Sequence, residues 1–456
     1  MNLPAIIFFF AVAAALWAVP RRLAPVPLLI GCCYMTMGQS LNLGLINLPI
    51  FRMLLIVGML RVFIKKEFAP GGRNKIDTLM MVWGCWVMFA SCFHQFKPGA
   101  GPVYTSGVVM NVTFVYFLFR NWIRDAGEIA DIAKALAIIL APVAVEMALE
   151  RVTGKNNFSV FGYVPPNVDI REGKFRAQGP FGHSILAGTV GAVCFPLMVG
   201  IWSRHRRSAI IGMIVCLFMI FASASSGPIM SLLIGIVAMI LWNQRSLVSL
   251  IRWAVVGVYV IAEMVMDRPA YYLISKIDLA GGSTGWHRSR LIEAFFGHFG
   301  EWWFAGTDRT RHWMPQGVPI GDGNHIDITN YYITFAVLGG LLSMLLVIFI
   351  LCRAFSWIGK ILQNGETLEN DDQFMVWCLG AGLVAHAATS ISVAYFDQSM
   401  IFFWLNIAVI SSLYSSVMIG AFENDAELVS DEDELDLERG SRSAQYGTSI
   451  ETAGRI

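Results

Sequence analysis

Long apolar runs alternate with short polar breaks along most of this chain. A hydrocarbon core about 30 Å thick requires roughly 20 apolar residues per helix. Runs of that kind occur at 3–20, 23–43, 45–64, 77–95, 103–120, 129–148, 184–202, 208–223, 227–242, 251–266, 328–352, 374–394 and 399–419. They are continuously apolar without alternation, which favours helices over a transmembrane β-barrel. The pattern predicts an all-α polytopic membrane protein with twelve or thirteen transmembrane helices.

Composition agrees with this fold class. Hydrophobic residues make up 56% of the chain and charged residues 14%, whereas soluble domains carry roughly 25% charged residues. The eight cysteines all fall in predicted helices and form no disulfide framework or metal-binding pair. The first span lacks the positively charged start of a cleaved signal peptide, so we expect it to be retained. No nucleic-acid partner is expected.

Basic residues in the short loops predict the orientation in the membrane. They gather on one side of the thirteen-span arrangement, which marks that side as cytoplasmic: Arg21, Arg22, Lys65, Lys66, Arg73, Lys75, Arg120, Arg124, Arg204, Arg206, Arg207, Arg245, Arg252, Arg353 and Lys360. Thirteen spans place the N-terminus outside and the C-terminus inside, and twelve place both ends inside. The longer loops, 150–182 and 267–327, face outside under either count.

Four regions follow from this organisation. Residues 1–266 form a transmembrane bundle that includes the outer loop 150–182, and residues 267–327 form a large outer loop. Residues 328–420 add the C-terminal transmembrane helices. Residues 421–456 are rich in Asp and Glu and poor in large apolar groups, so we expect a disordered acidic tail in the cytoplasm.

The large outer loop contains an amphipathic segment, residues 288–304. Its large apolar side chains fall on a single helical face: Leu291, Ile292, Phe295, Phe296, Phe299, Trp302 and Trp303. A helix rich in Phe and Trp between membrane spans is expected to lie in the interface plane. It either only packs on the bundle or also offers a surface beside which a lipid-linked substrate rests.

Arginines in the two outer loops are the candidate anion-binding residues. Arg176 lies directly before a membrane span, and Arg288 and Arg290 lie at the start of the amphipathic segment. The planar guanidinium group grips phosphate oxygens through paired hydrogen bonds. Each residue taken alone is also explained as an anchor at the membrane edge, so the alternatives stay open at this point.

His325 and Asp327 are the candidate catalytic residues. A neutral imidazole removes a proton from a hydroxyl near pH 7, and Asp327 is placed in the sequence to orient or polarise it. The alternative is a divalent-cation site built from His325 and the neighbouring carboxylates. No second His or carboxylate follows at a recognised metal spacing, so we predict no metal ligand.

Four motifs follow one another along the chain: Arg176-x-x-Gly179-x-Phe181-x-His183, Ser223-Ala224-Ser225-Ser226-Gly227, Ser283-Thr284-Gly285-Trp286-His287-Arg288 followed by Gly306, and His325 before a helix with Gly339-Gly340. With these motifs in this order, the chain resembles the O-antigen ligase and polysaccharide polymerase family over roughly residues 170–350. The family usually has Pro-Asn after the first histidine, where Ser184-Ile185 stand here. It usually has Arg at the position of Ser226 and often Asn at that of Ile326.

The resemblance implies a C-type membrane glycosyltransferase fold acting at the periplasmic face of the bacterial inner membrane. Members transfer a glycan from a polyprenyl-diphosphate carrier to an acceptor hydroxyl without a cofactor or metal ion. By this resemblance, Arg176 and Arg288 hold the diphosphate and His325 assists the acceptor. Because the chain departs from the family pattern after His183, we expect His183 to be structural. Implied partners are the lipid-linked glycan donor, a saccharide acceptor and membrane lipid, with a chain-length regulator as a possible protein partner.

Under this resemblance, our first interpretation is a polymerase of exopolysaccharide or O-antigen repeat units. A ligase that attaches the glycan to lipid A-core or to protein is the second interpretation, because donor and leaving group are the same. The third is a transporter or a flippase for the lipid-linked glycan. Ionisable residues within predicted spans are the signal for that class, and the clear candidates are Arg52, Arg61, Glu146, Glu263 and His386.

Overall fold

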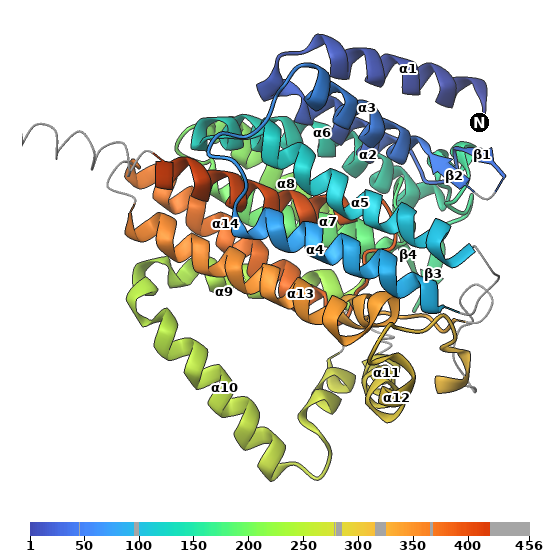
Figure 1. Ribbon diagram of the computed structural model, residues 1–456, viewed down its shortest axis with the longest axis vertical. Coiled ribbons are helices and arrows are strands. Elements are labelled where there is room, and N and C mark those ends of the chain that lie inside the picture. Colours follow the sequence, from blue (N-terminus) through green and yellow to red (C-terminus); the bar gives the residue numbers. More distant parts are fainter. Residues whose placement is uncertain are drawn as a thin grey trace, which may run out of the picture.

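The computed structural model describes residues 1–44, 46–94, 100–277, 279, 285–314, 325–364 and 368–419. The chain is mostly helical (Figure 1). Its helices are α1 (Leu3–Ala18), α2 (Pro25–Tyr34), α3 (Ile50–Ile64), α4 (Lys75–Ala90), α5 (Ala100–Trp122), α6 (Ala126–Thr153), α7 (Ser184–Gly200), α8 (Arg206–Ala222), α9 (Ser226–Ile240), α10 (Val248–Val265), α11 (Gly285–Gly297), α12 (Phe299–Trp302), α13 (Tyr331–Gln363), α14 (Asn370–Thr389) and a last helix, Met400–Ile419.

Two short antiparallel hairpins interrupt the helices. β1 (Ser40–Leu43) pairs with β2 (Ile46–Pro49), and β3 (Asp169–Arg171) pairs with β4 (Lys174–Arg176). The first hairpin corrects the predicted span 23–43, because α2 ends at Tyr34 and the chain then becomes extended. The polar residues Gln39, Ser40 and Asn42, followed by a positive φ at Gly44, favour a turn there rather than a helix.

Local sequence signals explain where several helices begin. Asn74 and Asp77 form a reciprocal capping box at the start of α4. Asp125 and Asn330 accept the backbone N–H groups of Glu128 and Ile333 at the starts of α6 and α13. Such side chains satisfy N–H groups that the first turn of a helix leaves without partners. These ends lie where the polar breaks of the sequence fall.

Each of the thirteen predicted spans contains a helix. Among the described residues, six helical stretches are both long and apolar enough to cross a membrane: Lys75–Phe93, Gly101–Trp122, Ala126–Thr153, Ser226–Val265, Tyr331–Gln363 and Met400–Ile419. Two further apolar helices, Leu3–Ala18 and Ser184–Gly200, are shorter. These helices identify a membrane protein, whereas twelve or thirteen crossings remain a prediction.

The helix α10 contributes no side chain to the core. None of its residues is buried, and Figure 1 shows it lying apart from the bundle that the other long helices form. Its exposed residues are mostly large and apolar, as in Trp253, Val258, Ile261 and Met264. Such a surface is unfavourable in water and suits contact with lipid chains.

The loops predicted to face outside share one end of the bundle. The hairpins and the helices α11 and α12 lie at the same end as the N-terminus (Figure 1). The side chain of Asn2 donates to the carbonyl of Val160 at 3.0 Å, and that of Gln39 donates to the carbonyl of Phe161 at 2.9 Å. We call this the loop end of the molecule.

The basic loops gather at the opposite end. Arg204 pairs with Asp372 at 2.7 Å, and Arg124 donates to the carbonyl of Phe68 at 2.8 Å. Because Asn2 lies at the loop end and Arg21 bonds Glu128 at the basic end, α1 runs between the two. Whether α1 is itself a membrane crossing stays a prediction. Which end faces which side of a membrane stays a prediction, and the acidic tail from 421 lies outside the described residues.

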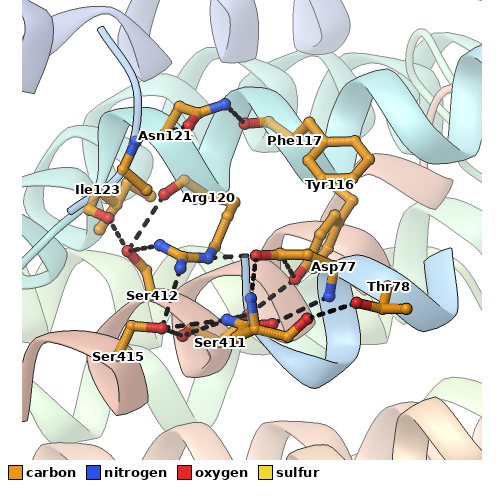
Figure 2. Close-up of polar contacts among 12 residues, drawn as sticks. Asp77, Thr78, Tyr116, Phe117, Arg120, Asn121, Ile123, Ser411, Ser412 and Ser415 are labelled. Atoms are coloured by element: carbon orange, nitrogen blue, oxygen red, sulfur yellow. Dashed lines mark hydrogen bonds and ion pairs between the residues drawn. The ribbon is translucent and has the colours of Figure 1, made fainter. Parts of the chain in front are cut away.

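A buried polar cluster ties three helices together toward the basic end (Figure 2). Arg120 of α5 lies 3.5 Å from the carboxylate of Asp77 on α4 and donates to Ser415 on the last helix at 2.9 Å. The hydroxyl of Tyr116 lies 2.6 Å from Asp77 and 2.7 Å from Ser411. Removing one partner of such a pair leaves a buried charge uncompensated, so we assign the cluster a structural role.

The amphipathic segment 288–304 differs from the prediction of one continuous interfacial helix. It is divided into α11 and α12 at His298. Leu291, Phe295 and Trp302 are buried in a second core with residues of α13, so about half of the apolar face packs on the bundle. The other half stays exposed: Phe296, Phe299, Trp303 and Phe304. Location of this half at a membrane interface remains a prediction.

Candidate functional site

Arg176 is held at the end of β4 and is almost completely buried. One terminal nitrogen of its guanidinium group lies 2.9 Å from the carboxylate of Asp169, and the other donates to the hydroxyl of Ser225 at 2.8 Å. Its Nε is buried and has no hydrogen-bond partner among the described residues. Ser225 belongs to the second motif of the sequence, so the fold brings the first two motifs into direct contact.

A buried carboxylate shapes the turn after Arg176. Glu150 at the end of α6 accepts the backbone N–H groups of Gln178 and Gly179, each at 2.7 Å. Gly179 has a φ of +57°, a conformation that glycine adopts without the steric cost that a side chain brings. The glycine of the first motif is therefore required by the geometry of this turn.

Arg288 lies on the inner face of α11 and is 9% exposed. Its Nε donates to the carbonyl oxygen of Ser392 at 2.9 Å. Among the described residues, no protein group accepts a hydrogen bond from its two terminal nitrogens. Arg288 therefore presents a fixed pair of donors, which is the geometry that a carboxylate or a phosphate accepts.

The segment 390–399 supports both arginine-bearing loops and was missed in the sequence. Besides Ser392, which accepts from Arg288, its residue Asp397 accepts the backbone N–H of Gly182 at 2.6 Å, and Gln398 donates to the carbonyl of Pro180 at 2.8 Å. Burial raises the pKa of Asp397 above its usual value. The segment is a polar, non-helical connection between α14 and the last helix.

The same segment also fixes the start of α13. Asn330 donates to the carbonyl of Ile391 at 2.9 Å, and the backbone N–H of Tyr331 donates to the carbonyl of Ser390 at 2.8 Å. The signal that identifies the segment is the cluster Asp397-Gln398-Ser399 between two apolar spans. The predicted span 374–394 hid part of it, because α14 ends at Thr389.

Electrostatic coupling shows that Arg176 and Arg288 share one region. Burial lowers the pKa of each, and the nearby charge of Arg171 lowers both further. The charge of Arg176 also lowers the pKa of Arg288, whereas Asp327 acts in the opposite direction. Both guanidinium groups nevertheless stay charged near neutral pH. We call Arg171, Arg176 and Arg288 the arginine cluster.

Charges of both signs act on the two buried arginines. The guanidinium group of Arg171 lowers the pKa of Arg176 and of Arg288, whereas the carboxylate of Asp169 raises that of Arg176 and the carboxylate of Asp327 raises that of Arg288. Crowded buried cations repel one another, and an anion among them relieves that repulsion. Because guanidinium groups match phosphate oxygens in geometry, the cluster is suited to bind a phosphorylated group.

The structure places the two predicted catalytic residues in different surroundings. The backbone carbonyl of Asp327 lies 3.0 Å from Nε2 of His287, and the negative charge of its carboxylate raises the pKa of Arg288. His325 is half-buried, and its Nδ1 lies 3.5 Å from the hydroxyl of Thr310. Asp327 is therefore brought to the arginine cluster.

Asp327 does not orient His325 in this structure. The carboxylate that raises the pKa of His325 is that of Asp308, but burial and the neighbouring His94 lower it and determine the net shift. A lowered pKa keeps the imidazole neutral near pH 7, the form that accepts a proton. The part of the alternative cation site that includes Asp322 lies outside the described residues.

Arg290 is separated from the other two candidate arginines. Two residues along a helix correspond to roughly 200° of rotation, so Arg290 and Arg288 point to nearly opposite faces of α11. Arg290 is exposed and pairs with Glu293 at 2.9 Å. The structure does not bring it to the arginine cluster.

His183 caps a helix. Its Nδ1 accepts the backbone N–H of Ile185 at 3.1 Å at the start of α7. Burial, followed by the charge of Arg176, lowers its pKa to about 4. The ring nitrogen that accepts this bond must be unprotonated, in agreement with the structural role expected for His183.

Two glycine positions of the motifs meet where α13 is broken. Gly340 has a φ of +74° and Gly306 a φ of +82°. The backbone N–H of Thr307 donates to Val337 at 2.9 Å, and that of Leu341 donates to Trp303 at 2.8 Å. A Cβ atom at either glycine would overlap a carbonyl oxygen of the other segment. The glycines allow the outer loop to bond directly to the interrupted helix.

A scan of the chain against models of protein families finds no match, and a search of curated proteins finds no similar sequence. The functional assignment therefore depends on the residues of the arginine cluster and on the loops that hold them.

Proposed function

We propose that the protein is a membrane glycosyltransferase that polymerises polyprenyl-diphosphate-linked oligosaccharide units into a surface polysaccharide. The observation that carries this proposal is the arginine cluster, in which buried Arg176 lies near enough to buried Arg288 for its charge to lower the pKa of Arg288, although the two are more than a hundred residues apart in the sequence. Arg176 ends β4, and the apolar helix α7 begins shortly after it in the sequence. A ligand with a charged diphosphate and a long lipid chain fits both surroundings.

The cluster favours the step in which the diphosphate leaves. An acceptor hydroxyl attacks the anomeric carbon of the donor glycan, and the bond from that carbon to the diphosphate oxygen breaks. Negative charge accumulates on the leaving polyprenyl diphosphate, and cations fixed in advance stabilise such charge most effectively. Arg176 and Arg288 are held by protein contacts before any ligand binds, as this mechanism requires.

His325 is the base in this proposal. Its lowered pKa keeps it neutral, so that it accepts the proton of the acceptor hydroxyl as the new glycosidic bond forms. His325 lies two residues before Asp327, and the charge of Asp327 raises the pKa of Arg288. A short stretch of backbone therefore connects the base to the proposed diphosphate site. The acceptor is the growing glycan in a polymerase, and lipid A-core or a protein in a ligase.

Transport is the alternative that the structure favours less. The ionisable residues that suggested it have local partners: Arg61 pairs with Glu67 at 2.7 Å, Arg52 donates to Asn111 at 3.0 Å, and Glu146 accepts from Asn157. Residues with structural contacts of this kind need no role in moving a substrate. A flippase for the lipid-linked glycan stays an outcome of the test below.

The test uses purified protein in lipid nanodiscs with lipid-linked oligosaccharide extracted from the native membranes. The proposal predicts longer lipid-linked glycans together with release of polyprenyl diphosphate in equal amounts. A ligase releases the same lipid but transfers a single glycan to an added lipid A-core or protein acceptor. A flippase, assayed in vesicles, moves the donor across the bilayer without releasing diphosphate, and that result would contradict the proposal.

A further inference from the structure

A second group of polar side chains lies in the outer loop, apart from the arginine cluster. His298 and Glu301 come from the junction of α11 and α12, and His312 comes from the single turn Arg311–Trp313. One ligand atom from each lies within 4.8 Å of the other two. We propose that His298, Glu301 and His312 bind a divalent transition-metal ion, for which Zn²⁺ is the best fit.

The donor set selects the class of ion. Two imidazoles and one carboxylate suit Zn²⁺ and related ions, whereas Ca²⁺ and Mg²⁺ prefer sites made of oxygen ligands. Three protein ligands leave a fourth position of a tetrahedral ion for water. The site is open to solvent on one side, since the side chains of Glu301 and His312 are 40% and 53% exposed.

Neighbouring groups already orient the ligands. Nδ1 of His298 lies 2.9 Å from the carbonyl oxygen of Ala294, so this nitrogen carries the proton and Nε2 keeps its lone pair. The indole N–H of Trp313 donates to the carboxylate of Glu301 at 3.0 Å. Carbonyl and donor groups of this kind fix the tautomer and the direction of ligands in metal sites.

A simple surface ion pair explains less of this arrangement. Glu301 and His312 lie 2.8 Å apart, and an exposed pair of that kind contributes only about 0–1 kcal/mol. It accounts neither for the third ligand nor for the oriented Nε2 of His298. The ring of His298 also stacks on Trp313 at 5.5 Å between centroids, which holds the imidazole in place.

The ion would connect the α11–α12 junction to the segment that supports His325. Two residues before His312, the hydroxyl of Thr310 accepts the backbone N–H of Ile326 at 3.1 Å and lies 3.5 Å from His325. Binding at His312 therefore restrains Thr310 and its neighbours. This role is structural and does not depend on the function proposed above.

Direct metal titration tests the proposal. The full-length protein, free of any histidine tag, is stripped with a chelator in nanodiscs and titrated with Co²⁺ followed by Zn²⁺. We expect one Co²⁺ per chain with the visible absorption of a tetrahedral site, displaced by Zn²⁺ and not by Ca²⁺ or Mg²⁺. The proposal would be overturned if Ca²⁺ or Mg²⁺ displaced Co²⁺ as readily as Zn²⁺ does. It would also be overturned if His312→Ala and Glu301→Gln kept the Co²⁺ absorption.

The variants separate a metal site from a general structural effect. Glu301 and His312 are exposed, so Glu301→Gln and His312→Ala should fold and lose the tight site. Trp313→Phe removes the donor to Glu301 and changes the ring that stacks on His298, and it should weaken binding by about 10–100-fold. The matched control is His205→Ala, because His205 is a partly exposed histidine that faces Asp131 at the basic end, and it should bind as the wild type does.

Hydrogen exchange provides a second readout that is independent of activity. Zn²⁺ should slow amide exchange in residues 306–313 of the wild type and leave that of His312→Ala unchanged. If Zn²⁺ slows exchange equally in both, the ion binds elsewhere and the proposal fails.

Discussion

Replacement of Arg288 is the sharpest perturbation of the arginine cluster. Its Nε is committed to the carbonyl of Ser392 at 2.9 Å, which leaves the two terminal nitrogens for a ligand. Removing the charged partner of a buried, hydrogen-bonded ion contact costs about 2–5 kcal/mol. That energy corresponds to a rate loss of roughly thirty-fold to several thousand-fold, which we expect for Arg288→Ala in glycan transfer.

The same substitution has a separate effect on stability. The carbonyl of the half-buried Ser392 loses its partner, and because a fully buried unsatisfied acceptor costs about 1–3 kcal/mol, the loss here should be at or below the lower end of that range. Membrane levels and melting temperature must therefore be measured beside turnover. Arg288→Lys restores the charge but not the fork of two parallel donors, so its rate of glycan transfer should remain well below that of the wild type.

The assay measures release of polyprenyl diphosphate per molecule of folded protein. Arg290→Ala is the matched comparison, because Arg290 lies on the same helix, is exposed and pairs with Glu293. An exposed pair of this kind is worth at most about 1 kcal/mol, so near wild-type turnover is expected. Wild-type turnover in Arg288→Ala, or equal losses in the two variants, would refute the assignment of the diphosphate site.

Three further predictions follow from the described contacts. His325→Ala should keep donor binding while turnover falls by about 10²–10⁴-fold. Because burial lowers the pKa of His325 and the base acts in its neutral form, the wild-type rate should rise with pH to a plateau through a midpoint below 6.5. A midpoint above 6.5 would contradict the role of His325 as the base. Asp77→Ala, which leaves Arg120 buried without its carboxylate, should destabilise the fold by about 3–5 kcal/mol, seen as a lower melting temperature in nanodiscs, and an unchanged melting temperature would exclude a stabilising pair. In a cysteine-free background, Val160→Cys should react with an impermeant thiol reagent in spheroplasts and Arg245→Cys only after permeabilisation; the reverse pattern would invert the orientation.

Helix positions were largely predictable because they depend on local sequence. Apolar runs and capping residues such as Asn74 and Asp125 act within a few residues of the helix they affect. The main local error, a helix through 23–43, arose from counting apolar residues across polar positions that start the β1–β2 hairpin. The predicted span 328–352 also ended too early, because the apolar pattern fades before α13 ends at Gln363.

The candidate site was predictable only in part because it joins distant segments. Arg176 and Arg288 were identified from their type and position, and the structure brings them together. The sequence did not show that Arg290 points away from them, because that depends on which face of α11 packs inward. Nor did it reveal Asp397 and Gln398, whose partners at Gly182 and Pro180 lie more than two hundred residues away.

The most direct test of the central claim is a double-mutant cycle on donor binding. Binding of a polyprenyl diphosphate to nanodiscs is measured for the wild type, Arg176→Ala, Arg288→Ala and the double variant. If both residues hold one diphosphate, each single substitution weakens binding and the double variant loses less than the sum of the two, by about 0.5–3 kcal/mol of coupling. Additive losses would place the two arginines in separate sites, and undiminished binding in all three variants would contradict the account.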